Sequence, residues 1–88
     1  MKYTVVWTPA AEEELASIWV NSADREGIAD AANVLDHELA RAPAAVGESR
    51  PNAQRIAHCL PLGIRFQILE DHRLVRVLAV WPCRRIAR

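Results

Sequence analysis

The sequence predicts an α+β fold with the element order β-α-α-β-β-β. We expect an antiparallel four-stranded sheet with a two-helix hairpin packed on one face. Three observations predict this fold. Residues 2–8 have the β-branched and aromatic composition of a strand. Residues 9–42 carry two stripes of apolar side chains at helical spacing, and residues 55–81 alternate in short runs separated by turns.

Length and composition indicate one globular domain. At 88 residues the chain has enough core for a single domain, which we expect to span residues 1–88. Its 51% hydrophobic and 25% charged residues exclude a disordered protein. No apolar run approaches the roughly 18 residues that cross a membrane, and the N-terminal apolar patch is too short for a signal peptide. The sequence therefore predicts a cytoplasmic protein without a membrane partner.

The first helix is predicted over residues 9–22. Pro9 suits the first helical position, and Thr8 before it suits the N-cap. Apolar residues then recur at helical spacing, and Trp19 lies on this stripe. We therefore expect Trp19 in the core.

The second helix follows a short break. Asp24 is placed to cap it, and Pro43 is placed to end it. Two helices joined by about three residues must be antiparallel neighbours. Residues 43–54 contain Gly, Ser, Asn and two prolines, which predicts a loop.

Three segments of the second half alternate as strands do. One face of the segment 55–60 would carry Ile56, His58 and Leu60. The other face would then carry Arg55, Ala57 and Cys59. In the segment 64–69 the core face would carry Ile64, Phe66 and Ile68, and the opposite face Arg65, Gln67 and Leu69. Residues 74–81 would form the last strand.

The net charge of zero hides a strong asymmetry. Residues 1–49 carry three basic and nine acidic side chains, whereas residues 50–88 carry eight arginines and two acidic side chains. Such asymmetry indicates an anionic partner for the basic half. The guanidinium fork of arginine suits phosphate and carboxylate, although a GC-rich genome would also favour arginine codons.

The sheet face without helices, here called the open face, is where we expect these arginines. Arg65 and Gln67 belong to it by alternation on their strand, and Arg55 would share it from the neighbouring strand. Arg76 points opposite to its valine neighbours and is also expected there. The result would be a shallow basic surface, although a merely solvated sheet face fits the same pattern.

The cysteines and histidines give weaker signals. Cys59 and Cys83 lack the CxxC spacing of a zinc site, so we expect two partly buried thiols, with a disulfide as the alternative. His72 lies in a predicted turn and is expected in solvent. His58 alternates with two aliphatic residues and is expected to be packed.

The chain as a whole resembles a known family. The resemblance rests on the segments "WTPAAEEEL", "PAAVGESR", "PLGIRFQI" and "VRVLAVWPCRR" in this order, with an acidic helical hairpin between the first two. These features are similar to those of the RelE/ParE toxins of type II toxin–antitoxin modules, which include plasmid stabilization proteins. The resemblance implies the fold predicted above.

The family implies two activities on one fold. RelE-like members are mRNA interferases that cleave mRNA in the ribosomal A site, and ParE-like members inhibit DNA gyrase without enzymatic activity of their own. In RelE-like enzymes, basic residues on the open face hold phosphate and stabilise the charge that develops as a 2′-hydroxyl attacks phosphorus. The arginine placement favours this RNA-directed activity. A gyrase inhibitor, and an inactive homologue that only binds its antitoxin, stay open.

The resemblance also implies site residues. By position in the family pattern, the candidate catalytic residues are Arg55, Arg65, Arg84 and Arg85. The candidate substrate-binding residues are Arg76, Gln67 and Arg50. The chain lacks the family's C-terminal tyrosine and paired lysines, because its only tyrosine is Tyr3 and its only lysine is Lys2. Any proton-transfer group would therefore be His58 or His72.

The implied partners are a cognate antitoxin, typically encoded by the adjacent gene, and either the ribosome with its mRNA or DNA gyrase. An antitoxin segment that folds on binding would cover the arginines with acidic side chains. Val20, off the main helical stripe, and Trp81, at a strand end, are the candidate contacts. No cofactor and no metal are expected.

Overall fold

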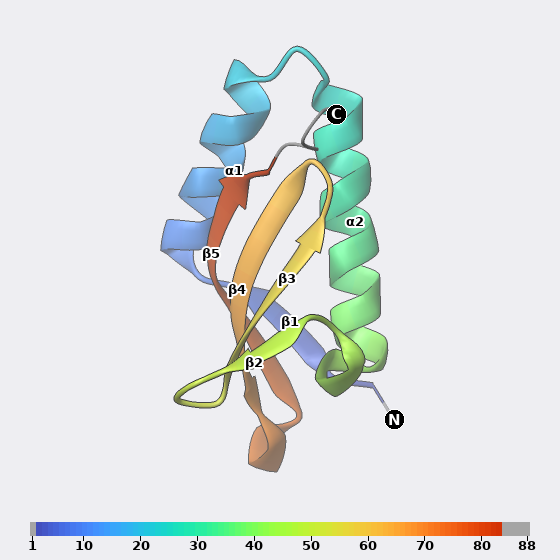
Figure 1. Cartoon of the computed structure of the whole chain (residues 1–88), viewed down its shortest axis with the longest axis vertical. Helices are drawn as coiled ribbons and strands as arrows, with labels where there is room; N and C mark the ends of the chain where they lie inside the picture. Colours follow the sequence, from blue (N-terminus) through green and yellow to red (C-terminus); the bar gives the residue numbers. More distant parts are fainter. Residues whose placement is uncertain (1, 84–88) are drawn as a thin grey trace.

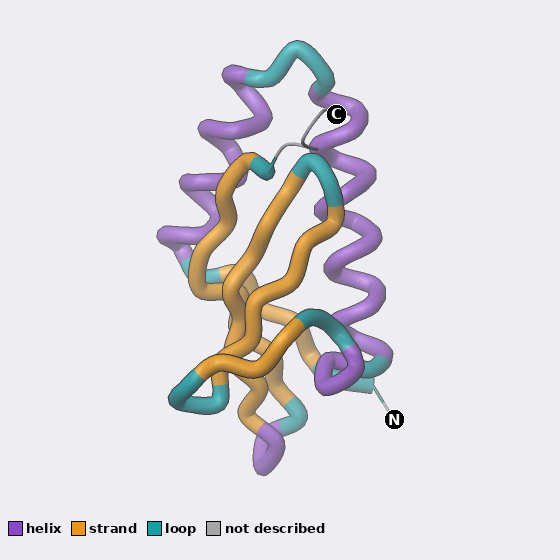
Figure 2. Tube along the Cα trace, in the orientation of Figure 1, coloured by secondary structure: helices purple, strands orange, loops and turns teal. Residues whose placement is uncertain are grey.

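The computed structural model describes residues 2–83, which form a five-stranded mixed sheet with two α-helices on one face (Figure 1). The sheet order is β1-β5-β4-β3-β2. The strands are β1 Thr4–Trp7, β2 Glu48–Arg50, β3 Gln54–Cys59, β4 Leu62–Leu69 and β5 Leu74–Pro82. The helices are α1 Pro9–Asn21 and α2 Arg25–Arg41, with short 3-10 turns at Pro43–Ala45 and Glu70–His72. Figure 2 shows the sheet in front of the helical hairpin.

Both helices begin where the sequence predicts. Thr8 Oγ1 accepts a hydrogen bond of 3.2 Å from the backbone N–H of Ala11, and Asp24 Oδ1 accepts one of 3.0 Å from that of Gly27. These are N-caps, which satisfy donors that a helix leaves unpaired. Among residues 2–83, neither helix is long and apolar enough to span a bilayer.

The core lies between the helices and the sheet. Its centre consists of fully buried side chains from β4 and β5: Leu62, Ile64, Phe66, Val75 and Val77. Helix α2 contributes Ile28, Ala31, Leu35 and Leu39. Each large apolar side chain buried here stabilises the fold by roughly 1.5–3 kcal/mol. The face of β4 that points to the helices is therefore strongly specified.

The predicted fold class is confirmed, with two differences in the sheet. A fifth strand, β2, forms within the segment that the sequence predicts as a loop. The sheet is also mixed, because β1 runs parallel to β5, with Thr4 beside Leu74 and Trp7 beside Val77. A tight hairpin would force antiparallel pairing, but β1 leads into the helical hairpin and not into a hairpin turn, so its direction is not fixed in that way.

The register of β3 differs from the prediction. Leu60 and Pro61 form the turn between β3 and β4, and Cys59 pairs with the fully buried Leu62. Paired residues on adjacent strands share a face. Arg55 therefore pairs with Phe66 and belongs to the helix side, whereas His58 belongs to the open face and is exposed. The expectations of Arg55 on the open face and of a packed His58 were both wrong.

Arg55 holds the edge strand β2 in place. Its Nε donates to the carbonyl of Val46, its Nη2 to that of Gly47 and its Nη1 to Ser49 Oγ, each at 2.8 Å. All three arms of the guanidinium are thus occupied by the segment that enters and forms β2. This arrangement explains why a loop-like sequence pairs with the sheet there.

A β-bulge reverses the alternation of β5. Arg65 pairs with Ala79 and Phe66 with Val77, which leaves Leu78 as the extra residue. Before the bulge, Val77 faces the core; after it, Trp81 pairs with Gly63 and faces the open side. Without the extra residue Trp81 would share the core side with Val77, so the bulge re-aims this side chain.

The outer edge of β5 is closed where β1 ends. The backbone N–H of Thr8 donates to the carbonyl of Val77 at 3.1 Å. Further along, Glu14 Oε1 from α1 accepts a hydrogen bond of 3.0 Å from the N–H of Val80. Pro82 then has no N–H to offer. Helix α1 thus provides a hydrogen-bond acceptor for β5 at a position beyond the end of β1.

Replacing Arg55 with lysine should destabilise the protein although the charge is kept. Lysine cannot reproduce the three-armed fork, and hydrogen bonds to charged groups are worth roughly 1.5–3 kcal/mol. Because this site is only partly buried, we expect a loss of about 1–2 kcal/mol in the free energy of unfolding, measured by urea denaturation. The matched control is Arg65→Lys, which removes no hydrogen bond within residues 2–83 and should change stability little. Equal stability of the two variants would contradict the anchoring role.

Replacing Glu70 with glutamine should lower the pKa of Tyr3. The Tyr3 hydroxyl donates to Glu70 Oε1 at 2.7 Å, and this bond is the largest cause of a pKa raised above 10.0, the ordinary tyrosine value. Because the pKa of Tyr3 is higher in the folded than in the unfolded protein, the hydrogen bond to Glu70 stabilises the fold fully at pH values below the unfolded-state pKa. This contribution to stability is lost as the pH rises through the folded-state pKa. Ultraviolet absorbance of the single tyrosinate, followed against pH, measures the shift. The control is Glu26→Gln in the first turn of α2, at the opposite end of this helix from Ala40, whose carbonyl accepts from the Tyr3 N–H; it should leave the titration unchanged. An unchanged titration in Glu70→Gln would contradict the role of this bond.

Candidate functional site

The open face has four cross-strand rows, of which one contains only Thr4, Leu74 and Leu69, and the other three, here called the first, second and third rows, carry the candidate residues. The first row runs from β1 to β2 through Val6, Arg76, Gln67, Gln54 and Arg50. The second row contains Ala79, Arg65, Ile56 and Glu48. The third row contains Trp81, Gly63 and His58. The expected placement of Arg65, Arg76 and Gln67 on this face is confirmed.

Within residues 2–83, two arginines of the open face have no partner for their guanidinium groups. Arg65 and Arg76 are exposed, and neither side chain forms a hydrogen bond or an ion pair within residues 2–83. The side-chain amide of Gln67, which lies beside Arg76 in the first row, reaches the carbonyl of Asn52 at 3.4 Å. The guanidinium groups are therefore available to an anion.

Arg50 is partly neutralised. Its Nη2 lies 3.3 Å from Glu48 Oε1, and its Nη1 donates to the carbonyl of Ser49 at 2.8 Å. Such an exposed pair is weak, because water screens it. Glu48 is the acidic residue of the three rows, so the face as a whole is positively charged.

The third row contains two aromatic rings. The indole of Trp81 lies against the bare backbone of Gly63, where a Cβ would collide with Nε1, Cε2 and Cζ2 of the indole. The ring of His58 meets the indole edge to face, with centroids 6.2 Å apart and planes at 78°. Trp81 is half-buried and His58 is exposed. Sequence reasoning missed this pair, because neither the turn nor the bulge that aligns it is visible in the alternation.

The other predicted site residues do not lie on this face. Arg55 is on the helix side, where its guanidinium holds β2. Arg84 and Arg85 lie outside the described residues. Val20 is on α1 and is 57% exposed, as expected for a contact residue. Cys59 and Cys83 are free thiols of intermediate burial, and His72 is exposed in its turn.

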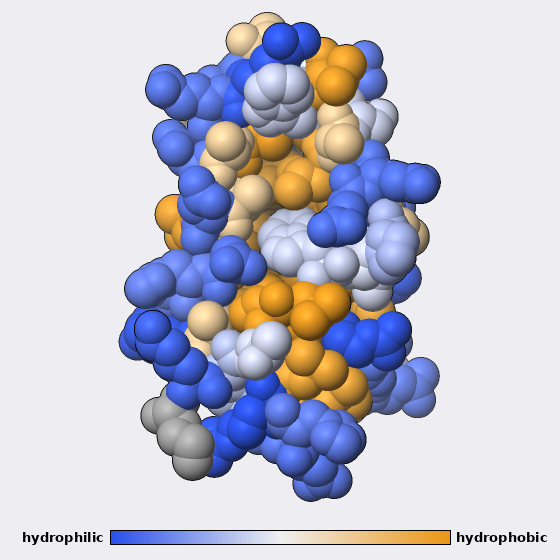
Figure 3. Space-filling model, turned by 180° about the vertical axis from the view of Figure 1, so that it is seen from behind, coloured by the Kyte–Doolittle hydropathy of each residue, from blue (hydrophilic) through white to orange (hydrophobic). Residues whose placement is uncertain are grey.

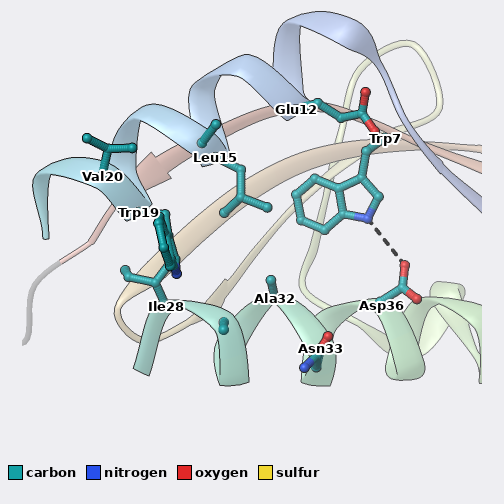
Figure 4. Close-up of a pocket in the computed structure, with 11 residues that line it drawn as sticks. Trp7, Glu12, Leu15, Trp19, Val20, Ile28, Ala32, Asn33 and Asp36 are labelled. Carbon is teal, nitrogen blue, oxygen red and sulfur yellow. Dashed lines mark hydrogen bonds between the residues drawn. The ribbon is translucent and has the colours of Figure 1, made fainter. Parts of the chain in front are cut away.

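The helix side carries a second surface feature, an apolar groove of about 550 Å³ between α1 and α2. Figure 3 shows this face, with apolar colour in the hollow between the helices. Trp7, Leu15, Trp19 and Ile28 line it, and the Trp7 Nε1–H donates to Asp36 Oδ1 at 3.2 Å (Figure 4).

Trp19 was expected in the core but is 42% exposed in this groove. It lies in the last turn of α1, across from Ile28 of α2 (Figure 4). The guanidinium of Arg25 covers part of its ring, 4.7 Å from the centroid. This cation–π contact compensates for incomplete burial, which a hydrophobic stripe alone does not reveal.

The open face is suited to binding and stabilising negative charge. Guanidinium groups stay charged at all physiological pH values and match phosphate oxygens in geometry. Histidine is the side chain that most often transfers protons near neutral pH, and His58 shares the face with Arg65. Within residues 2–83, no group of three His, Cys, Asp or Glu side chains is arranged to hold a metal ion.

Several solved structures share this fold. This chain is similar to a chain of the toxin–antitoxin complex RelBE2 of Mycobacterium tuberculosis, with a TM-score of 0.75 and 24% identity over 93% of this chain and 92% of that chain. It is also similar to the chromosomal ParDE toxin–antitoxin system of P. aeruginosa, with a TM-score of 0.70 and 15% identity over 93% and 97%. A third match is the intact E. coli RelBE complex, with a TM-score of 0.65 and 17% identity over 94% and 99%. No curated protein matches the sequence.

These structural likenesses show the fold, and the family follows from the sequence. The family model that matches residues 5–87 describes the ParE toxin of the type II toxin–antitoxin system parDE. The match includes both helices and all five strands apart from the first residue of β1. The chain therefore belongs to this family and is the toxin component of a type II toxin–antitoxin module.

Proposed function

We propose that this toxin acts on RNA and cleaves mRNA in the translating ribosome, using the open face of its sheet. The observation that carries the proposal is the pair Arg65 and Arg76, exposed on one rigid face and free of hydrogen bonds and ion pairs within residues 2–83. Positive side chains in such an arrangement attract a phosphate backbone. Arg76, Gln67 and Arg50, in one row, would hold the substrate.

Arg65 is the best placed residue to stabilise the transition state. When a 2′-hydroxyl attacks the neighbouring phosphorus, negative charge grows on the phosphate oxygens, and a guanidinium carried by a strand of the open face would stabilise that charge. Arg84 and Arg85 remain proposed contributors of further positive charge. Arg55 would contribute indirectly, by holding β2 and hence Arg50.

His58 is the proposed proton-transfer group. It lies on β3, on the open face, and pairs with Gly63 of β4. Arg65 lies two positions after Gly63 on β4. Alternate residues of a strand are roughly 6.6 Å apart and point to the same side, so His58 and Arg65 would both reach one phosphodiester. Tyr3 is instead engaged with Glu70. His58 would therefore take the proton-transfer role, because this chain lacks the family's C-terminal tyrosine and paired lysines.

Inhibition of DNA gyrase is the second candidate function. The match to a model of ParE toxins favours it, and this activity needs a binding surface but no catalytic groups. A homologue without toxic activity, which only binds an antitoxin, is the remaining alternative.

An antitoxin is the proposed protein partner. The M. tuberculosis and E. coli relatives were solved as toxin–antitoxin complexes, and we propose that a cognate antitoxin from the adjacent gene binds this chain in the cytoplasm. Acidic side chains of its binding segment would pair with Arg65 and Arg76. Val20 and Trp81 are the proposed apolar contacts.

Expression of the toxin alone in bacteria distinguishes the candidate functions. We expect incorporation of labelled methionine to collapse within minutes, before incorporation of labelled thymidine falls. Earlier loss of thymidine incorporation would instead identify gyrase as the target and overturn the catalytic assignments. No effect from a soluble, folded protein would favour the inactive homologue.

Two substitutions test the site. Arg65→Ala should reduce mRNA cleavage about 10²–10³-fold, as the loss of one transition-state donor does. His58→Gln should reduce it by about 10²–10⁴-fold, the usual contribution of a general acid or base. Cleavage is measured by primer extension on a reporter mRNA in purified translating ribosomes. Arg41→Ala removes the same charge from the end of α2 and should retain activity. Equal loss in Arg41→Ala, or full activity in Arg65→Ala, would contradict the assignment.

A further inference from the structure

We propose that Trp81, supported by Gly63 and flanked by His58, is a stacking platform for one unpaired base of a single-stranded RNA. This inference rests on the proposed function, because it assigns a second role to the same face. Indole rings bind bases of any identity through their π-faces. The platform would therefore position the RNA without selecting a sequence.

The platform is built by three features of the sheet. Gly63 lacks a side chain, so the indole of Trp81 approaches its backbone directly. The edge-to-face contact with His58 restrains the ring from a second strand. The bulge at Leu78 turns Trp81 to the open side. Since the indole is backed by Gly63 and only half-buried, its remaining surface is available to a ligand.

The surroundings match one nucleotide. Arg65 lies two positions from Gly63 on β4 and points to the same side, roughly 6.6 Å away along the strand. A base stacked on Trp81 would therefore place its phosphate near a guanidinium that is unpaired within the described chain. Arg76 and Gln67 continue the polar surface across the next strand positions.

The composition of the face favours RNA over a protein. Besides aliphatic positions such as Val6 and Ile56, the open face combines one large aromatic ring with arginine and glutamine side chains. An aromatic ring among such polar side chains is the pattern of single-strand binding surfaces. Among the described residues, three of the five exposed large apolar side chains, Trp19, Val20 and Val34, lie on the helical hairpin, whereas Val6 lies on β1 and Leu60 in the turn between β3 and β4. A helix of a protein partner would find more apolar area there.

Nuclear magnetic resonance of the nitrogen-15-labelled chain tests the proposal. Its three tryptophans give separate indole N–H signals, and Trp81→Phe identifies the one of interest. A short 2′-O-methyl oligoribonucleotide, which lacks the attacking hydroxyl, is added up to millimolar concentration. We expect the Trp81 indole and His58 signals to shift with the oligomer. The Trp7 and Trp19 signals should stay in place, because these residues line the groove on the other side.

An abasic oligomer with the same backbone is the matched ligand control. It should shift the Arg65 side-chain signal but not the Trp81 indole, since it offers phosphate without a base. Trp81→Leu, which keeps an apolar cover on Gly63, should weaken binding of the intact oligomer about five- to hundredfold. Its folding is checked by the unchanged signals of Trp7 and Trp19.

The outcomes separate this inference from the proposed function. Shifts at Arg65 without a shift at Trp81 would overturn the platform and leave RNA binding intact. Equal shifts with the abasic oligomer would also overturn it. A response of Trp81 to an acidic peptide but not to RNA would make the face a protein-docking surface, again overturning the proposal. A base-dependent shift at Trp81, in a protein that first stops thymidine incorporation in cells, would support the platform while the proposed function fails.

Discussion

The burial of three alternate residues on β4 is the constraint on which the rest of the structure depends. Leu62, Ile64 and Phe66 are completely removed from solvent, so this strand has one possible orientation toward the helices. Every neighbouring residue then takes its face from its pairing with β4. The open face is the complement of this core: Gly63, Arg65 and Gln67 are outside because the residues between them are inside. The position of each candidate functional residue is therefore a consequence of core packing.

The elements with strong local signals could be predicted from the sequence. Thr8, Pro9 and Asp24 define the helix starts because capping depends on residues within one turn. Phe66 and Arg65 were assigned to the correct faces because their strand alternates cleanly. The family resemblance was confirmed, since a model of ParE toxins matches residues 5–87. The strand β2 was not predictable in this way, because its pairing depends on side-chain hydrogen bonds from Arg55, which alternation and turn signals do not reveal.

The site was less predictable than the fold, because two faces differ by a single residue of register. His58 and Arg55 exchanged their expected faces once the turn was found to use Leu60 and Pro61. Trp81 reached the open face only through the extra residue Leu78. Neither event leaves a signal in the alternation pattern, since a slip of one position is equally compatible with the composition of the strands. Alternation did place three residues correctly, namely Arg65, Arg76 and Gln67. They lie on β4 and β5, the strands whose inward-facing residues are fully buried.

The closure of the β5 edge by Glu14 also bears on how this chain behaves in a crowded cell. A strand with unpaired backbone groups recruits other strands and begins aggregation. Here the part of β5 that extends past β1 offers no such template, because the Thr8 N–H, the Glu14 carboxylate and Pro82 occupy or remove its bonding groups. The free edges of the described sheet are thus β1, of four residues, and β2, of three. In a toxin released from its antitoxin, the longest strand of the sheet would therefore stay protected at this edge by groups of its own chain, and strand-to-strand association would be left to the two short edge strands.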